Sequence, residues 1–405
     1  WTHVFAPASG YVQSQIGAHR MTLRGKAAIA GVFEFPHRKA PNVTALQIHA
    51  ICAKYALEEA GLTTKDVDAL FTAGVGGLSP LPLAEYLGIQ PTYMDGTSVG
   101  GSAFEFHVEH AAAGIAAGII DVALITYGST AASQGTAIGT GMREVAEAGD
   151  NFEFPYGSIT VARYAMAAQR HMYEYGTTSE QLAEIAVAMR RHAGLNPNAM
   201  FREPIGVADV LNSRYIAEPL HLLDCCIISD GGGAVVLTSV ERARDLKRPP
   251  VVVMGTGEAG THATMGQMPS FTRTPAALSG PRAFAMARLG PTDIDLAMIY
   301  DSFTITVLMT LEDLGFCKKG EGGGFVSGGR IQLGGELPVN TDGGGLSSNH
   351  PGMRGIFLLI EAAKQLRDDF RGTERQVPDC NVAVCHGTGG SLMSGGTIIL
   401  ARDGR

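Results

Sequence analysis

The chain has 405 residues, of which 45% are hydrophobic and 17% charged, a composition typical of a globular protein with a large core. The formal net charge of −8 argues against non-specific binding to nucleic acid or to an anionic membrane surface. No apolar run reaches the roughly 20 residues of a membrane-spanning helix, and six cysteines without a C-x-x-C pair argue against a disulfide framework and against a metal site.

The first segment, residues 1–20, lacks the basic and apolar regions of a signal peptide, and Met21 is the natural start that we expect. We treat residues 1–20 as an N-terminal extension and predict a cytoplasmic protein. The remaining length is too great for one simple core. We divide it into an N-terminal half, residues 21–245, and a C-terminal half, residues 246–405.

An internal repeat relates the two halves. Residues 56–73 and 284–301 both predict a helix, a break containing glycine, a short D-x-D turn and an apolar strand. Each half then predicts a glycine-rich turn that leads into a helix and a strand, over residues 95–118 and 121–128 and again over 347–366 and 381–387. This duplicated alternation of helices and buried strands predicts an α/β fold of two packed halves.

An insertion of about residues 130–215 interrupts the first half. It predicts two helices, and the T-S-E-Q sequence from Thr178 to Gln181 has the form of a capping box that begins a helix. The segment is rich in methionine, arginine and tyrosine. It is either a helical lid over a ligand site or a helical decoration of the fold.

Two glycine-rich turns at helix entrances carry candidate catalytic residues. Ser98 lies in D-G-T-S-V-G-G-S (95–102), where a nucleophile would gain from the helix N-terminus and from free N–H groups. A simple helix-capping serine is the alternative. His350 precedes Pro351, which holds the histidine backbone extended and favours display of the ring at the helix entrance.

Two further candidates lie at the ends of predicted strands. Cys385 and His386 begin C-H-G-T-G-G (385–390), and adjacent residues in an extended chain point to opposite sides, so one of the two faces the site. A thiolate there is a candidate base, and a buried strand-end thiol is the alternative. Tyr300 and Asp301 in Y-D-S-F are either hydrogen-bonding site residues or packing residues.

Taken together, these segments resemble the thiolase superfamily, and most of all the sterol-carrier-protein-type (SCP2-type) thiolases and their bacterial lipid-transfer relatives. The resemblance spans residues 22–402. It rests on five segments, namely the N-x-x-G-G…H-P-x-G-x-x-G turn (340–355), L-D-C-C-x-x-S-D-G (223–231), the insertion (156–199), Y-D-S-F (300–303) and C-H-G-T-G-G (385–390).

The resemblance implies a thiolase fold with five αβαβα layers, a homodimer or dimer of dimers, and an acyl-CoA substrate. Coenzyme A is then a substrate, and no tightly bound cofactor is expected. Arg163 and Arg190 in the insertion become candidates for binding the CoA phosphates, as do Arg170 and Arg191, although exposed helix-face arginine is the plainer interpretation.

The same resemblance assigns the site residues by position. The nucleophilic cysteine of the family corresponds to Ser98, the base to His350 and the second catalytic cysteine to Cys385. The N–H of Gly387, with that of Ser98, corresponds to the oxyanion hole. Tyr300 stands where the SCP2-type H-D-C-F motif has histidine, and His386 matches the histidine of a related H-N-x-G-G turn.

The missing cysteine leaves three expectations for function. The first is a thiolase-like acyltransferase that acts on 3-oxoacyl-CoA with Ser98 in place of the nucleophile, although a serine needs a stronger base than a thiol. The second is a retro-aldolase that cleaves a 3-hydroxyacyl-CoA, such as a steroid side chain, with a partner chain carrying an OB-like domain. The third is a non-catalytic binder of acyl-CoA or lipid. All three require the loops around residues 98, 300, 350 and 386 to share one site.

Overall fold

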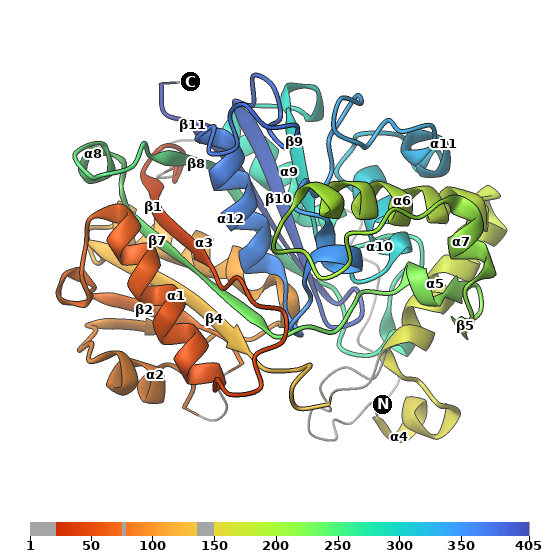
Figure 1. The fold of residues 1–405 in the computed structure, drawn as a ribbon, viewed down its shortest axis with the longest axis horizontal. Coiled ribbons are helices and arrows are strands. Elements are labelled where there is room, and N and C mark those ends of the chain that lie inside the picture. The colour runs from red at the N-terminus through yellow and green to blue at the C-terminus, as the bar shows by residue number, and fades with distance from the viewer. Residues whose placement is uncertain (1–21, 75–77, 136–149, 405) are drawn as a thin grey trace, which may run out of the picture.

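The structure is a computed structural model that describes residues 22–74, 78–135 and 150–404 (Figure 1). The predicted extension 1–20, the expected start at Met21 and residues 136–149 of the insertion lie outside these described residues.

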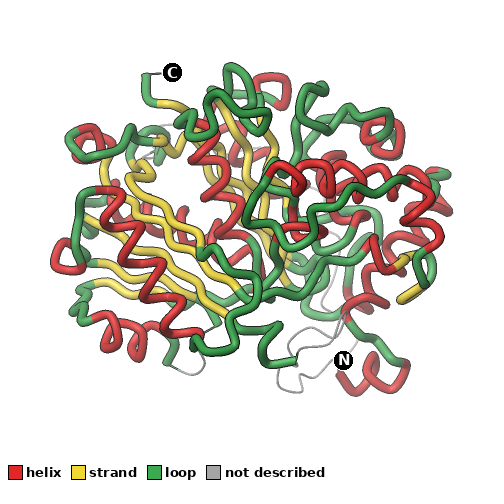
Figure 2. Tube along the Cα trace, viewed as in Figure 1, coloured by secondary structure: helices red, strands yellow, loops and turns green. Residues whose placement is uncertain are grey.

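One continuous sheet runs through the molecule. Nine of the described strands form this sheet, in the order β3-β2-β4-β7-β1-β8-β11-β10-β9. Figure 2 shows the strands in yellow between the helices. The first-half strands are β1 (Ala27–Glu34), β2 (Ala69–Thr72), β3 (Tyr93–Asp95), β4 (Val122–Ser129) and β7 (Gly231–Ser239). The second-half strands are β8 (Val251–Gly260), β9 (Leu296–Ile299), β10 (Val382–Gly389) and β11 (Ser394–Arg402). The halves join where β1 pairs with β8, antiparallel, at Ala28–Val252 and Ile29–Val251.

The predicted repeat is confirmed in detail. Helices α1 (Ala45–Ala60) and α9 (Ala276–Ala287) are each followed by a left-handed residue, a short 3-10 turn and a strand, β2 or β9. The second aspartate of each D-x-D turn then ties two parallel strands together. The Asp68 carboxylate accepts a hydrogen bond from the Val122 N–H at 2.8 Å, and Asp295 accepts one from Val382 at 2.9 Å. Equivalent residues thus do equivalent work in both halves.

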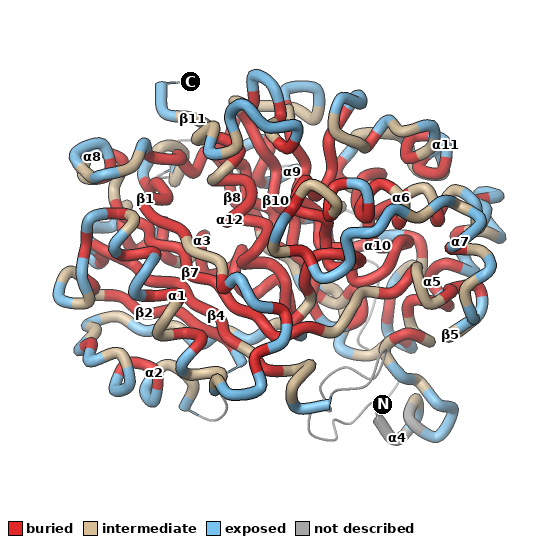
Figure 3. Tube along the Cα trace, viewed as in Figure 1, coloured by how far each residue is buried: buried red, intermediate tan, exposed pale blue. Residues whose placement is uncertain are grey.

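The helices form three layers around the sheet. Helices α3 (Ala103–Ala116) and α12 (Gly355–Leu366) pack against each other and against strands of both halves, so they form the central layer. Helices α1 and α9 cover the outer faces of their own halves. Strands such as β4 and β7 are buried on both faces, which explains their continuous apolar sequences (Figure 3). This arrangement confirms the predicted α/β class.

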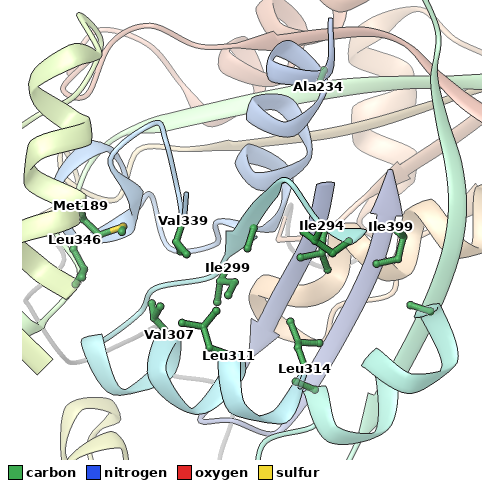
Figure 4. Packing of buried hydrophobic residues seen from close by; sticks show 14 of the residues in the cluster. Met189, Ala234, Ile294, Ile299, Val307, Leu311, Leu314, Val339, Leu346 and Ile399 are labelled. Atoms are coloured by element: carbon green, nitrogen blue, oxygen red, sulfur yellow. The ribbon is translucent and has the colours of Figure 1, made fainter. Parts of the chain in front are cut away.

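The insertion packs beside the second half. Its described elements are α4 (Asp150–Glu153), α5 (Thr160–Tyr175), α6 (Ser179–Leu195), α7 (Val207–Asn212), β5 (Tyr215–Ala217) and β6 (Leu220–His221). The Thr178–Gln181 capping box is present, as predicted. Helix α6 contacts α10 (Thr304–Asp313) and a π-helical turn, Gly344–Ser348 (Figure 1), and Met189 lies beside Leu346 in the core there (Figure 4). The remaining helices are α2 (Pro80–Leu87), α8 (Val240–Arg244) and α11 (Gly322–Val326).

Candidate functional site

A tyrosine and a histidine from distant segments meet at the C-terminal end of β9. Tyr300 directly follows β9 and is buried, with 4% of its surface exposed. Its hydroxyl oxygen lies 2.8 Å from Nε2 of His350, and the two rings are perpendicular with centroids 5.6 Å apart. The structure therefore brings together two of the residues that the sequence singled out.

The backbone around His350 is anchored on both sides. The His350 N–H donates to the Ser229 hydroxyl at 2.9 Å, and its carbonyl accepts from the Ser229 N–H at 3.3 Å. The Tyr127 hydroxyl donates to the Pro351 carbonyl at 2.6 Å and accepts from the Met353 N–H at 3.1 Å. The histidine ring is thus presented by a loop whose polar groups are already satisfied.

A buried arginine, Arg354, holds the same loop in place through ion pairs with two aspartates. Arg354 is fully buried, and its Nη2 lies 2.6 Å from one Asp342 carboxylate oxygen while its Nε lies 3.2 Å from Asp301. Asp301 also accepts the N–H groups of Gly345 at 2.7 Å and Leu346 at 3.1 Å. One cation between two carboxylates therefore locks the residue after Tyr300 to the turn that precedes His350. Arg354 lies inside the 340–355 motif but was not predicted as a site residue.

The protonation states of the pair follow from burial and charge. Burial, with the nearby positive charge of Arg354, lowers the pKa of His350 to about 4. Burial, with the nearby groups Cys226, Tyr164 and Tyr127, raises the pKa of Tyr300 well above its ordinary value. At neutral pH the site therefore holds a neutral imidazole against a neutral phenol. In the tautomer with Nε2 unprotonated, the phenol donates and the imidazole is ready to take its proton.

Two glycines at the entrance to α3 complete the junction. A Cβ atom on Gly101 would lie 2.3 Å from the Tyr300 ring and 2.7 Å from the Thr388 carbonyl oxygen. Gly100 has φ +76°, and a Cβ there would lie 2.6 Å from the Gly390 nitrogen. Only glycine permits this approach. The loops around 98, 300, 350 and 386 do meet, and Gly100 and Gly101 are the first-loop residues that make the contact.

Ser98 lies two residues before this junction and is exposed. Within the described part of the chain it has no hydrogen-bond partner, and the bonds of the His350 ring and of the Cys385 thiol go to other groups. No hydrogen bond among the described residues therefore links Ser98 to the Tyr300–His350 pair. The glycine-rich turn pointed to the right loop, but the steric requirement for Gly100 and Gly101 appears only when the opposing turn is in place.

Cys385 and His386 point to opposite faces of β10, as their adjacency predicted. The Cys385 thiol faces the central layer, is fully buried and donates to the Leu358 carbonyl at 3.5 Å. Burial and the carboxyl of Glu105 raise the pKa of this thiol well above its ordinary value, so the thiolate base that the sequence suggested is disfavoured.

His386 faces the outer layer instead. Its Nδ1 lies 2.9 Å from the Thr397 hydroxyl, which in turn lies 2.8 Å from Ser279 of α9, and burial lowers the pKa of the imidazole to about 3. Its carbonyl oxygen accepts the Tyr300 N–H at 2.9 Å. His386 therefore holds Tyr300 through its backbone, and its ring lies apart from the pair.

The arginines expected at the CoA phosphates are engaged elsewhere in the fold. Arg190 is buried, donates to the Ser347 hydroxyl at 2.9 Å and lies over the Phe201 ring, so it ties α6 to the π-helical turn. This corrects the expectation of a free phosphate-binding cation there. Arg163 donates to Ser158 at 3.0 Å and lies 3.6 Å from Glu153. Arg170 and Arg191 are the exposed members of the set, paired with Glu174 and Gln332.

The structure adds two residues beside the pair that sequence reasoning missed. Tyr164 of α5 is buried and donates to the Gly390 carbonyl at 3.2 Å, which joins the insertion to the C-H-G-T-G-G turn. Cys226 is partly exposed and lies close enough to Tyr300 and Tyr164 to influence the pKa of both hydroxyls. Its presence in the 223–231 motif was the available signal.

The described residues show neither a metal site nor a membrane-spanning helix. They contain no group of three or more histidine, cysteine or acidic side chains arranged to hold a metal ion. None of the helices in the described part of the chain is long and apolar enough to cross a membrane.

Comparison with known proteins places this geometry in a family. The family described as thiolase C-terminal domain-like matches residues 257–402. A steroid side-chain-cleaving aldolase of Thermomonospora curvata is 38% identical over 91% of this chain and 96% of its own length. The 17-hydroxy-3-oxo-4-pregnene-20-carboxyl-CoA lyase of Mycobacterium tuberculosis is 38% identical over 85% of this chain and 92% of its own length.

A solved structure extends the match to the whole fold. The structure described as an Ltp2-ChsH2(DUF35) aldolase superimposes with a TM-score of 0.85 at 35% identity, covering 95% of this chain and 99% of the other. These relatives are enzymes. The chain belongs to the thiolase superfamily.

Proposed function

We propose that this protein is a lyase that cleaves a 3-hydroxyacyl-CoA by retro-aldol chemistry, with a steroid-type side chain as the substrate class. The observation that carries the proposal is the Tyr300–His350 hydrogen bond of 2.8 Å, which lies against the glycine junction, while in the described structure neither Ser98 nor Cys385 is hydrogen-bonded to this pair. The two relatives named as an aldolase and a CoA lyase support the same chemistry.

The proton transfers balance within this pair. The substrate 3-hydroxyl gives its proton to the Tyr300 oxygen while the Tyr300 proton passes to Nε2 of His350. As the new carbonyl forms, the C2–C3 bond breaks and its electrons move into the thioester to form an enolate. The imidazolium then returns its proton, through Tyr300, to C2 of the enolate. The products are a ketone or aldehyde and a shortened acyl-CoA, and no free coenzyme A is consumed.

The two unusual pKa values suit these roles. His350 is neutral at neutral pH, so it accepts a proton without first losing one. Tyr300 keeps its proton until a base receives it, because burial disfavours the phenolate. The enolate oxygen needs N–H donors, and we assign them to Gly387 near the end of β10 and to the α3 entrance opposite it, in place of the Ser98 N–H.

The first expectation, a thiolase-like acyltransferase, is less well supported than the lyase. Acyl transfer in this superfamily requires a covalent nucleophile next to the base. Ser98 is exposed and without a hydrogen bond in the described structure, and the Cys385 thiol is held neutral in the core. Retro-aldol cleavage needs neither group, because its bond breaks without an acyl-enzyme.

We further propose that the active form includes a small partner chain with an OB-like domain. The support is the related aldolase structure, whose description names a second component, ChsH2(DUF35), together with Ltp2. In this chain the four insertion arginines that the sequence offered as phosphate ligands, Arg163, Arg170, Arg190 and Arg191, are paired or packed. A partner that supplies cations for the CoA phosphates would therefore complete the substrate site.

The test is an assay without free coenzyme A. A steroid-type 3-hydroxyacyl-CoA is incubated with the purified protein, alone and co-expressed with a DUF35-type partner, and products are separated by mass. We expect ketone and shortened acyl-CoA in equal amounts. Turnover of a 3-oxoacyl-CoA that depends on added coenzyme A would instead establish the acyltransferase. Tight binding of either ester without any turnover would establish a non-catalytic binder.

A further inference from the structure

A buried carboxyl group beneath the glycine junction is not used by the chemistry proposed above. Glu105, in the first turn of α3, has 1% of its surface exposed. Neither of its carboxyl oxygens has a hydrogen-bond partner among the described residues. An unpaired carboxylate in such a place is costly, whereas a neutral carboxylic acid is tolerated.

Glu105 lies where three site-building segments meet. A Cβ atom on Gly387 would lie 2.1 Å from its Oε2, and one on Gly355, the first residue of α12, would lie 2.4 Å from the same oxygen. That second position is also 2.3 Å from the carbonyl oxygen of Gly101, whose other side packs on Tyr300. The carboxyl group therefore fills the space behind both the predicted oxyanion turn and the Tyr300 contact.

Among the described residues, the charged and titratable groups on the surrounding elements give Glu105 no counter-ion. On β10 the neighbour is the neutral Cys385 thiol, and Arg354 before α12 directs its guanidinium to two aspartates. On β8, Glu258 pairs with His110. Tyr300 after β9 is a neutral phenol, and His107 on α3 itself bonds the Thr97 carbonyl. Burial accordingly raises the pKa of Glu105 well above its ordinary value.

We propose that Glu105 is a positioning residue that works as a neutral acid, and that its ionisation turns the site off. This rests on the proposed lyase function. An ionised Glu105 would place a negative charge directly behind Gly387, where the enolate oxygen gathers charge in the transition state. The Glu105 carboxylate and the enolate oxygen would then be two negative charges close together in a site that excludes water, where like charges repel strongly. The neutral acid instead fills the space between α3, α12 and β10 without an opposing field.

A stability measurement tests the protonation state without any substrate. Between the unfolded value of 4.5 and the raised folded pKa, the unfolded chain ionises Glu105 while the folded protein keeps it neutral, so wild-type stability falls as pH rises. Glu105→Gln removes this loss. We expect the Tm of E105Q minus that of wild type to increase as pH rises above about 4.5, until folded Glu105 itself ionises. A difference that stays constant, or that decreases, would show that Glu105 is ionised.

An activity measurement tests the link to the site. We expect the ratio of kcat/KM for E105Q to that of wild type to stay constant at each pH where folded Glu105 is neutral and to rise by up to about tenfold per pH unit once it ionises. The matched control is Glu361→Gln, because Glu361 on α12 is also buried but accepts hydrogen bonds from Thr341 and Arg375. E361Q should lower Tm at neutral pH and give a kcat/KM ratio that does not change with pH.

The two arms separate failure of this inference from failure of the proposed function. A flat activity ratio in an active lyase would overturn the positioning role of Glu105. The Tm arm does not depend on the reaction, so it decides the protonation state whatever chemistry the protein carries out.

Discussion

The entrances to α3 and α12 occupy equivalent places in the two repeated halves, yet they contribute in opposite ways. The α3 entrance offers almost no side chain, because Gly100 and Gly101 let the backbone touch Tyr300 and the facing turn. The α12 entrance offers a histidine ring held by a buried arginine between two aspartates. The two halves thus supply two similar helix entrances with different roles. The α3 entrance lets the backbone approach Tyr300 closely, and the α12 entrance supplies the imidazole proposed to transfer the proton.

The first and largest predicted effect comes from removing the buried ion pairs at the α12 entrance. Arg354→Met leaves Asp301 and Asp342 buried without their cation, which costs about 3–5 kcal/mol of unfolding free energy. Urea unfolding followed by circular dichroism measures the loss. Arg330→Met is the control, because its ion pair with Glu336 is exposed and is worth at most about 1 kcal/mol. Equal losses in the two variants would show that Arg354 does not carry the loop.

The second removes the proton pair itself. Tyr300→Phe and His350→Asn should each lower kcat by about 10²–10⁴-fold while the fold is retained. Because the two groups move one proton between them, the double variant should be little worse than either single variant. Steady-state kinetics of the three proteins measure the coupling. Losses that simply multiply would mean that Tyr300 and His350 act independently.

The third fills the space at α3. Gly101→Ala puts a methyl group where only 2.3 Å separates it from the Tyr300 ring. We expect kcat to fall by about 100-fold, since small misplacements of a reacting group have effects of this size. Gly324→Ala is the matched control, because nothing lies within 4 Å of a Cβ there. Wild-type kcat in G101A would show that the junction tolerates side chains.

The fourth prediction concerns the effect of pH on the protonation state of His350. The folded pKa of His350 lies at about 4, below the ordinary 6.5, so the imidazole is neutral above that value and protonated below it. We expect kcat/KM to be level near neutrality and to fall by up to tenfold per pH unit below about pH 4, as far as circular dichroism shows that the fold is retained. The same burial makes folding weaken by up to about 1.4 kcal/mol per pH unit as pH falls from 6.5 towards 4. Activity and circular dichroism are measured together, and an acid limb near 6.5 would contradict the assignment.

The smallest effect is expected at Ser98. Its side chain is exposed and makes no hydrogen bond within the described structure, so Ser98→Ala should change kcat by less than about twofold, as for other surface substitutions. Mass spectrometry of the protein during turnover provides the companion measurement. A trapped acyl group on Ser98, with loss of activity in S98A, would restore the serine nucleophile and the acyltransferase.

Much of the frame was predictable because it depends on local pattern. The repeat of helix, D-x-D turn and strand is written in consecutive residues, and both aspartates form the hydrogen bonds that the repeat demands. The Thr178 cap is likewise a four-residue property. Tyr300 and His350 were predictable as candidates, because each lies in a short motif at the end of an element.

Other features of the site were not predictable, because they arise between segments far apart in the chain. Arg190 has the sequence context of an exposed helix-face arginine, but it packs on Ser347, 157 residues away. The sequence indicated Ser98 as the reactive residue of the first loop, because a hydroxyl group can be recognised in a motif. The steric conflict between a side chain at position 101 and the Tyr300 ring cannot be recognised in this way. The need for Gly101 follows only from Tyr300, which is 199 positions further along the chain.

Local sequence patterns were enough to predict the two repeated halves, their order of elements and the four loops that carry polar residues, because hydrophobic period and turn chemistry act over a few neighbouring residues. Which of those polar residues meet depends instead on how distant segments pack. This packing buried Cys385 and turned His386 outward on one strand, left Ser98 exposed, and set the pKa of His350 through burial and the charge of Arg354. Burial and charge proximity depend on the packing of distant segments, and it is these that select the proton-transfer pair.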